Sequence, residues 1–593
     1  MKQTALLLAM AVLLCSCTAV PPSAGDTTGT TNPSAPTQSV SDREEDRIPT
    51  EAEYTATVVL ADGATTVQGE GVAINGDVVT VTKAGCYEIR GALSDGQLRV
   101  ETTDNGTVSL VLNGVNIHSD TTAPLFVRKS EKTVLSLASG SQNTLSDSVN
   151  AVYEDVTNEE PSATLFSKSD LTINGNGTLT VNAAFKDGIV SRDGLIITDG
   201  TVTVNAADDA VMGRDYVRIG GGVLTLTAKG DGIKSTNDAG EDVGYIVMEG
   251  GKLTVTSDKD GVQAKSALTV SGGEISVTAN GGSKNGTANI YNDFGWGVNS
   301  QDSSSDGKGL KAGTALTISG GKVTVDAADD AIHSNREIRI SGGEITAAAG
   351  DDGVHADEIL TVDNGILSVT KSYEGLEAAT ITLNGGTVSL TATDDGVNAS
   401  SGNSETSGDF GMHQNPFMSD DSVFSIHGGH MYVDAQGDGL DSNGIIEMTG
   451  GEVYVIGPSN SGNGTFDYGS SFAITGGKLV AIGSSGMATT PTSNTMNNIV
   501  WSGFAMYDAD DLTVTASDGT VIASLEATRS ASWLYVTCPE LKTGDEVTVT
   551  CGLASHTFTI AEGGNAEGTM GGFGGPGMGG GPGMGGGRPG RPW

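Results

Sequence analysis

The chain has few basic residues, and this shortage excludes several functions. Only 31 Lys and Arg stand against 73 Asp and Glu, so the 593-residue chain has a formal charge of −42. Such a surface repels phosphate groups, which argues against nucleic-acid binding and against attraction to anionic lipid head groups. Aromatic residues make up only 5% of the chain, which argues against a cellulose-binding platform of stacked tryptophan rings.

Cysteine is equally scarce, and no spacing of Cys and His is typical of a zinc site. Besides two cysteines near the N-terminus, the chain has Cys86, Cys538 and Cys551. Cys538 and Cys551 lie on two alternating segments joined by a turn. They either face each other across a hairpin and form a disulfide in an oxidising compartment, or stay unpaired. Cys86 is interpreted as a small buried hydrophobe.

No apolar run is long enough for a transmembrane helix. Residues 5–14 form a short apolar run after Lys2, and Leu14, Ser16 and Cys17 match a bacterial lipobox. Residues 1–17 are therefore predicted to be a lipoprotein signal peptide, with Cys17 lipidated and the protein held outside the cell on the bacterial membrane. The alternative is an ordinary signal peptide with incidental cysteines. Residues 18–50 are rich in Thr, Ser and Pro and are predicted to be a disordered tether.

Glycine is abundant, with 87 residues, but it follows no three-residue period and only 15 prolines accompany it, which excludes collagen. Gly-Gly pairs followed by short alternating runs recur from about residue 175 to 477. A second landmark, Asp-Gly or Asp-Ala, places its small residue at 188, 210 and 232, and again at 331, 353 and 375 with Glu in the last, which are steps of 22 residues. Short strands with inward Val, Ile and Leu at this period predict an all-β parallel β-helix solenoid with about 22 residues per coil.

The period sets the expected domain boundaries. The β-helix is predicted over residues 55–500, a small β unit over 501–562, and a disordered Gly/Met/Pro tail over 563–593. Two insertions interrupt the coils at 280–308 and 400–422. Long loops in solenoids often lie on a binding face. Tyr291 and Trp296 in the first insertion are therefore candidates for a local contact with sugar.

Acidic residues recur at the second landmark. Equivalent residues of adjacent coils stack about 4.8 Å apart, so these carboxylates form a column whose mutual repulsion must be offset. Calcium suits this role because one ion can bridge carboxylates of neighbouring coils. The best candidate cluster is Asp329, Asp330, Asp351 and Asp352, followed by Asp208, Asp209 and Asp231. The further candidate ligands are Asp187, Asp260, Asp394, Asp395 and Asp438.

A plainer interpretation stands beside calcium, because Asp-Gly is a common turn dipeptide. The paired aspartates are harder to explain in this way, since a turn needs only one such side chain. His333 and His355 follow two of these pairs at the same offset. They are candidates for binding sugar hydroxyls, or they merely soften the negative charge.

Several motifs carry a family resemblance: residues 328–334 (ADDAIHS), 350–356 (GDDGVHA), 371–378 (KSYEGLEA) and 457–464 (GPSNSGNG). Over about residues 75–500 the chain resembles the bacterial carbohydrate-binding domain-containing protein family, typified by a clostridial cellulose- and pectin-binding β-helix protein. The resemblance implies a right-handed parallel β-helix similar to polysaccharide lyases, bound Ca²⁺, and affinity for plant cell-wall polysaccharide, including acidic pectin.

Three functions are consistent with these features. The first is a surface-anchored lipoprotein that binds acidic polysaccharide such as polygalacturonate, with calcium on its own carboxylates presenting positive charge to the uronates, and without catalysis. The second is a calcium-dependent lyase with Lys234, Lys311 or Arg336 as the base. The third is an adhesin or scaffold that binds another protein through a flat β face.

Overall fold

The computed structural model of the chain describes residues 53–240, 242–286, 307–401 and 421–568. The signal peptide with Cys17, the tether, Tyr291 and Trp296 lie outside these residues. The described part contains strands and no α-helix, so the predicted all-β class is confirmed. None of its elements is a helix long and apolar enough to cross a membrane.

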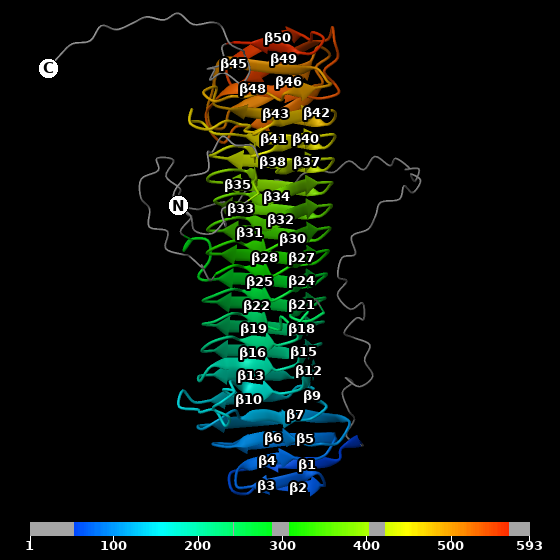
Figure 1. Cartoon of the computed structure of the whole chain (residues 1–593), viewed down its shortest axis with the longest axis vertical. Coiled ribbons are helices and arrows are strands. Elements are labelled where there is room, and N and C mark those ends of the chain that lie inside the picture. Colours follow the sequence, from blue (N-terminus) through cyan, green and yellow to red (C-terminus); the bar gives the residue numbers. More distant parts are fainter. Residues whose placement is uncertain (1–52, 241, 287–306, 402–420, 569–593) are drawn as a thin grey trace, which may run out of the picture. The chain divides into compact units, whose positions relative to one another are not determined.

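Most strands belong to one large, mostly parallel sheet, in which each strand pairs with the equivalent strand of the next coil. Figure 1 shows these coils one above another. The first ladder consists of β10 (Gln142–Asp147), β13 (Thr178–Ala183), β16 (Thr201–Ala206), β19 (Val223–Ala228), β22 (Lys252–Ser257), β25 (Glu274–Ala279), β28 (Lys322–Ala327), β31 (Glu344–Ala349), β33 (Ile366–Ser372), β35 (Thr387–Ala392), β38 (His430–Ala435), β41 (Glu452–Ile456) and β43 (Lys478–Gly483).

The second ladder is made mostly of very short strands. Its members are β11 (Ala163–Ser167), β14 (Asp187–Ser191), β17 (Val211–Gly213), β20 (Ile233–Ser235), β23 (Val262–Ala264), β26 (Leu310–Ala312), β29 (Ile332–Ser334), β32 (Val354–Val362), β34 (Leu376–Leu383), β36 (Val397–Ala399) and β39 (Leu440–Ser442). The candidate site residues lie on or just before these strands.

The third ladder closes each coil, and the long strands β32 and β34 run through both the second and the third ladder. Its other members are β9 (Lys132–Leu137), β12 (Asp170–Gly175), β15 (Gly194–Ile197), β18 (Tyr216–Ile219), β21 (Tyr245–Met248), β24 (Ala267–Val270), β27 (Ala315–Ile318), β30 (Glu337–Ile340), β37 (Val423–Ile426), β40 (Ile445–Met448), β42 (Ser471–Ile474) and β44 (Ser493–Asn494). This coil-on-coil pairing is the arrangement that the repeat predicts, and the right-handed winding stays a prediction.

Alternation explains why these residues form strands. In β19 the side chains of Leu224, Leu226 and Ala228 are buried while the residues between them are exposed. The inward residues of successive coils join into one continuous hydrophobic cluster. Each coil alone would leave its apolar face exposed, so stacking supplies the core.

The register survives both insertions. In the uninterrupted coils Lys322 pairs with Glu344, and Glu344 with Ile366, at the predicted step of 22 residues. Across the first insertion Val262 pairs with Leu310, and across the second Val397 pairs with Leu440. The strands on either side of each insertion therefore pair in the same register as the uninterrupted coils.

Antiparallel pairs end the stack on the N-terminal side. β1 (Ala56–Leu60) pairs with β2 (Thr66–Gly69), and β3 (Val72–Asn75) with β4 (Val78–Val81). The following strands return to parallel pairing with the coils: β5 (Gly85–Leu93), β6 (Gln97–Glu101), β7 (Thr107–Ser119) and β8 (Leu125–Lys129). Cys86 is buried in β5, as predicted.

The C-terminal unit joins the stack directly. β48 (Ala531–Thr537) pairs antiparallel with β43, the last strand of the first ladder, and with β45 (Asn498–Met506). β51 (Asn565–Glu567) pairs with β45, so the predicted disordered tail does not begin at residue 563. A second sheet of four strands has the order β47 (Val521–Glu526), β46 (Asp511–Ala516), β49 (Glu546–Cys551) and β50 (Ala554–Thr559).

Cys538 and Cys551 do not face each other across a hairpin and do not form a disulfide. Their segments lie in or next to β48 and β49, which belong to different sheets, so the two strands do not pair. Both cysteines are free and buried in the same C-terminal hydrophobic cluster. Burial raises the pKa of both thiols to about 12, so they act as apolar core residues.

The second glycine of each Gly-Gly turn has a structural reason. Gly343 has a φ of 90°, and a Cβ there would lie 3.0 Å from the carbonyl oxygen of Gly320 in the preceding coil. A side chain would therefore meet both backbone strain and a close neighbour.

The variant Gly343→Ala is predicted to lower the free energy of unfolding by about 1 to 2 kcal/mol, because alanine is strained at positive φ. Gly240→Ala is the control, since a Cβ there meets nothing within 4 Å. Thermal melting by circular dichroism compares both with the wild type. Equal melting temperatures for the two variants would contradict the proposed role of the turn.

Candidate functional site

The residues at the second landmark stack in register over ten positions, which we call the inner column. Backbone hydrogen bonds connect each position to the next coil, as from the Gly188 N–H to the Asp209 carbonyl and from the Ala331 N–H to the Asp352 carbonyl. Its members are Asp187, Asp209, Asp231, Asp260, Lys308, Asp330, Asp352, Glu374, Asp395 and Asp438. Nine of these ten side chains are acids, so the predicted carboxylate column is present.

In several acids of the inner column, one carboxylate oxygen accepts a backbone hydrogen bond from the next coil. Oδ1 of Asp209 accepts the backbone N–H of Asp231 at 2.7 Å, and Oδ1 of Asp231 accepts that of Asp260 at 3.1 Å. The same contact joins Asp395 to the Asp438 N–H at 2.6 Å. These acids thus satisfy backbone donors of the next coil.

A second column, which we call the outer column, is formed by the residues three positions after members of the inner column. Its residues follow one another in the register of the second ladder: Lys234, Gln263, Lys311, His333, His355, Glu377, Asn398 and Asp441. Each outer side chain therefore accompanies the acid or lysine three positions before it, as Lys234 accompanies Asp231. The charge of the outer column changes along the stack, from lysine through histidine to acid.

Lysines neutralise the first half of the columns. Lys234 Nζ lies 2.6 Å from Asp231 Oδ2 and 3.5 Å from Asp209 Oδ2, and Lys311 Nζ lies 3.0 Å from Asp260 Oδ2. Lys308 takes a position in the inner column itself, where its Nζ lies 2.5 Å from Asp330 Oδ2. The second carboxylate oxygen is thus used to bind cationic groups.

The candidate lyase bases are held in ion pairs. Burial alone would lower the pKa of Lys234, but the charges of Asp209 and Asp231 outweigh burial and raise it. A lysine held protonated in this way is a poor proton acceptor. Arg336 lies apart from the columns in an exposed pair with Glu358, with Nε and Oε2 3.6 Å apart.

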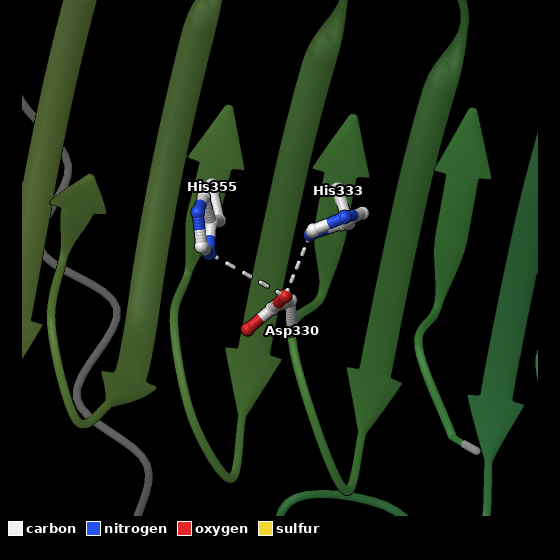
Figure 2. A group of neighbouring side chains, drawn as sticks. All are labelled: Asp330, His333 and His355. Atoms are coloured by element: carbon white, nitrogen blue, oxygen red, sulfur yellow. Dashed lines mark hydrogen bonds and ion pairs between the residues drawn. The ribbon is translucent and has the colours of Figure 1, made fainter. Parts of the chain in front are cut away.

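The two candidate histidines meet in the middle of the columns. Figure 2 shows Asp330 between His333 and His355, whose Nδ1 atoms lie 2.8 and 3.7 Å from Asp330 Oδ2. The ring centroids are 5.0 Å apart. Burial alone would raise the pKa of Asp330, but the hydrogen bond from His333 and the charge of Lys308 lower it. Asp330 is therefore ionised.

The next coils have many acids and few cations. Burial and the charges of Asp352 and Asp395 raise the pKa of Glu374 well above its usual value. Burial and Asp352 likewise raise the pKa of Glu377 to about 8. The pKa of Asp395 is raised by burial and by the charges of Asp438 and Asp441. Repulsion between neighbouring acids therefore contributes to the raised pKa values in this half of the columns.

Several predicted metal ligands do come together. Asp187, Asp208 and Asp209 have carboxylate oxygens within 4.8 Å of one another, as do Asp329, Asp330 and Asp351. A third group of this kind joins Asp438 with two acids that the sequence did not single out, Asp441 and Asp467.

These groups differ in how well they suit calcium. Burial and the charge of Asp209 raise the pKa of Asp187 to about 7. The donors of its group are all oxygen, which suits a hard cation. At Asp329 and Asp330 the Lys308 ammonium already lies 2.9 and 2.5 Å from the carboxylates. The cluster ranked first from the sequence therefore already has a counter-ion, so it suits calcium less well.

A shallow groove of about 480 Å³ lies beside the lysine-rich half of the outer column. Lys234, Lys265 and Lys311 line it, together with amides from Gln263 and Asn335. The Lys265 side chain is exposed. Three ammonium groups gather here beside Asp238, and two of them, those of Lys234 and Lys311, pair with aspartates of the inner column.

Some site residues had a weaker sequence signal. Lys308 precedes Gly309 just as Asp precedes Gly in the other coils, but a search for acids passes over it. Glu374 shares the 22-residue step, and Glu377 and Asp441 share the offset of the histidines. Searching by position in the repeat instead of by residue type would have found these residues.

The family model of carbohydrate-binding domain-containing proteins matches residues 75–353, so the resemblance is confirmed over that segment. A protein of the same description from Acetivibrio thermocellus is 39% identical over 137 residues, which are 23% of this chain and 48% of the relative. The matched segment thus spans about half the length of that relative. The solved structure of a polysaccharide lyase-like protein from C. thermocellum, a gadolinium derivative, is 33% identical, covers 38% of this chain and 92% of its own, and has a TM-score of 0.37.

The uncompensated acids predict how stability depends on pH. Asp351 has its pKa raised to about 7 by burial and by the charges of Asp330 and Asp329, while Lys308 opposes the shift. The folded chain then binds more protons than the unfolded chain. The stability from such acids is present below about pH 4 and is lost as the pH rises through about 7.

The metal-free protein is therefore predicted to melt at a lower temperature at about pH 8 than at about pH 5. Asp351→Asn should make this decrease smaller, because the amide does not ionise. Asp258→Asn, at an exposed turn, should leave it unchanged. Calorimetry in chelator measures all three proteins, and a melting temperature that stays level or rises with pH would contradict the prediction.

Proposed function

We propose that this chain, in which residues 75–353 match the carbohydrate-binding domain-containing protein family, binds an acidic plant cell-wall polysaccharide without cleaving it. The polymer class we propose is pectin, with polygalacturonate as the simplest example. The observation that carries this proposal is the groove lined by three lysines on a strongly acidic chain. A neutral glucan would need no such cluster of ammonium groups.

The groove has groups for both parts of a uronate. Lys265 and Lys311 would contact the sugar carboxylates, and Gln263 and Asn335 would hydrogen-bond to hydroxyls. The ammonium of Lys311 also pairs with Asp260, which fixes its position before a ligand arrives. Such preorganisation lowers the entropy cost of binding.

Calcium is the second part of the proposal. The residues that would hold it are the all-oxygen groups Asp187, Asp208 and Asp209, and Asp438, Asp441 and Asp467. Their oxygen donors suit calcium, and the raised pKa of Asp187 fits an acid crowded by Asp209 and Asp208. When bound, calcium would supply positive charge that reduces repulsion between the acids and attracts uronates.

The family resemblance also brings in a lyase as an alternative. The raised pKa of Lys234 makes it a poor base, and Arg336 stands outside the groove lining. These two observations favour binding over cleavage. We further propose that the chain winds as a right-handed β-helix and is displayed outside the cell through lipidated Cys17, with the polysaccharide as its partner.

The direct test is retention of the purified protein on immobilised polygalacturonate. Lys265→Ala is expected to weaken retention about fivefold, which corresponds to the loss of one charge contact of about 1 kcal/mol. Lys252→Ala is the matched control, because Lys252 is an exposed lysine paired with Glu274 at 2.8 Å outside the groove lining. Equal effects of the two variants would reject the groove as the binding site.

The same assay separates the other possibilities. A chelator is expected to weaken retention. Retention that is unchanged by the chelator would reject the role of calcium but would not reject the groove as the binding site. Absorbance of an unsaturated product is followed in parallel. Steady product formation would reject the non-catalytic function.

A further inference from the structure

The middle of the columns contains a mixed group of nitrogen and oxygen donors. His355 Nδ1 lies 3.2 Å from Asp352 Oδ2 and 3.3 Å from Glu377 Oε2. These three atoms belong to one group that lies within 4.8 Å. The ligands come from two successive coils, through β32 and β34 and the turn before β32. We propose that His355, Asp352 and Glu377 form a binding site for a divalent cation of the zinc class.

The distances suit such an ion. Zinc binds imidazole nitrogen and carboxylate oxygen at about 2.0 to 2.2 Å, so neighbouring ligand atoms in a tetrahedral site lie about 3.3 Å apart. The observed separations from His355 Nδ1 are 3.2 and 3.3 Å. Only small side-chain movements are needed to place all three donors around one ion.

The donor set distinguishes this site from the calcium groups. Calcium prefers oxygen ligands, whereas imidazole together with carboxylates is typical of zinc and neighbouring transition metals. The groups proposed for calcium contain only aspartates. The inner and outer columns therefore offer two different kinds of metal site in different coils.

The neighbouring residues orient the proposed ligands. Asp330 Oδ2 lies 3.7 Å from His355 Nδ1, but Lys308 and His333 already occupy that oxygen at 2.5 and 2.8 Å. Asp330 is therefore a positioning residue and not a ligand. The fourth coordination position of the proposed ion is left for water. On its other side, His355 Nε2 lies 3.6 Å from Asp357 Oδ1, a carboxylate that would accept the Nε2 proton once a metal occupies Nδ1.

The site is both enclosed and reachable. Asp352 is buried, while the side chains of His355 and Glu377 keep 26% and 24% of their surface exposed. Water is thus partly excluded around the carboxylates, and an ion still has a path from solvent. The sequence showed no zinc spacing because the ligands recur across coils, at positions 352, 355 and 377.

The test is titration of the chelator-treated full chain with Zn²⁺ in excess Ca²⁺, by calorimetry. One saturable zinc site that persists in calcium is expected. His355→Ala and Glu377→Gln should each weaken zinc binding at least about tenfold. His430→Ala is the matched control, because His430 Nδ1 faces a single carboxylate, Glu452, at 3.2 Å, and it should bind zinc as the wild type does.

Cobalt gives a second readout, since Co²⁺ held by nitrogen and oxygen in a tetrahedral site absorbs visible light. The wild type should show these bands and His355→Ala should lose them, while circular dichroism confirms that both are folded. Absence of a saturable site, displacement of zinc by calcium, or equal binding by His355→Ala would each overturn the proposal. None of these outcomes depends on whether the chain binds polysaccharide.

Discussion

The hydrogen bond from one coil's backbone to the carboxylate of the coil before it is the contact on which the rest of the site depends. Asp209 accepts the N–H of Asp231, and the same contact recurs from Asp330 to Asp352. It satisfies a backbone donor at these turns and supports the register of the second ladder. Repeating it also stacks like charges at coil spacing. An arrangement that stabilises each turn locally therefore creates repulsion along the whole column.

The chain resolves this repulsion differently in its two halves. Lys234, Lys308 and Lys311 supply positive charge within the first half of the columns, and Lys234 and Lys311 also line the groove. Beyond His355 the outer column contains Glu377, Asn398 and Asp441, so no lysine follows there. The proposed ligands are distributed along the stack: an acidic polymer near the lysines, a zinc-class ion at His355, and calcium at the first and last members of the inner column, Asp187 and Asp438. The histidines stand at the change from one half to the other.

Much of this could be predicted from periodicity. The step of 22 residues and the alternation of inward residues specify parallel coils, and the repeated Asp before Gly specifies the acidic column. The sequence did not reveal Lys308 in that column, because a search for acidic residues passes over a lysine at the same position of the repeat. The hairpin considered for Cys538 and Cys551 does not form, because pairing at this end of the chain is set by the stack and not by the local sequence. The last coil leaves an open edge, and β48 pairs with that edge instead of with its neighbour in sequence.

The central claim is that the clustered carboxylates of the columns hold bound cations at neutral pH. Crystals grown with both calcium and zinc, measured on either side of the zinc absorption edge, test it most directly. The account predicts an anomalous zinc peak between His355, Asp352 and Glu377, and non-zinc density between Asp187, Asp208 and Asp209. Columns that contain only water at these places, with the acids still in register, would contradict it.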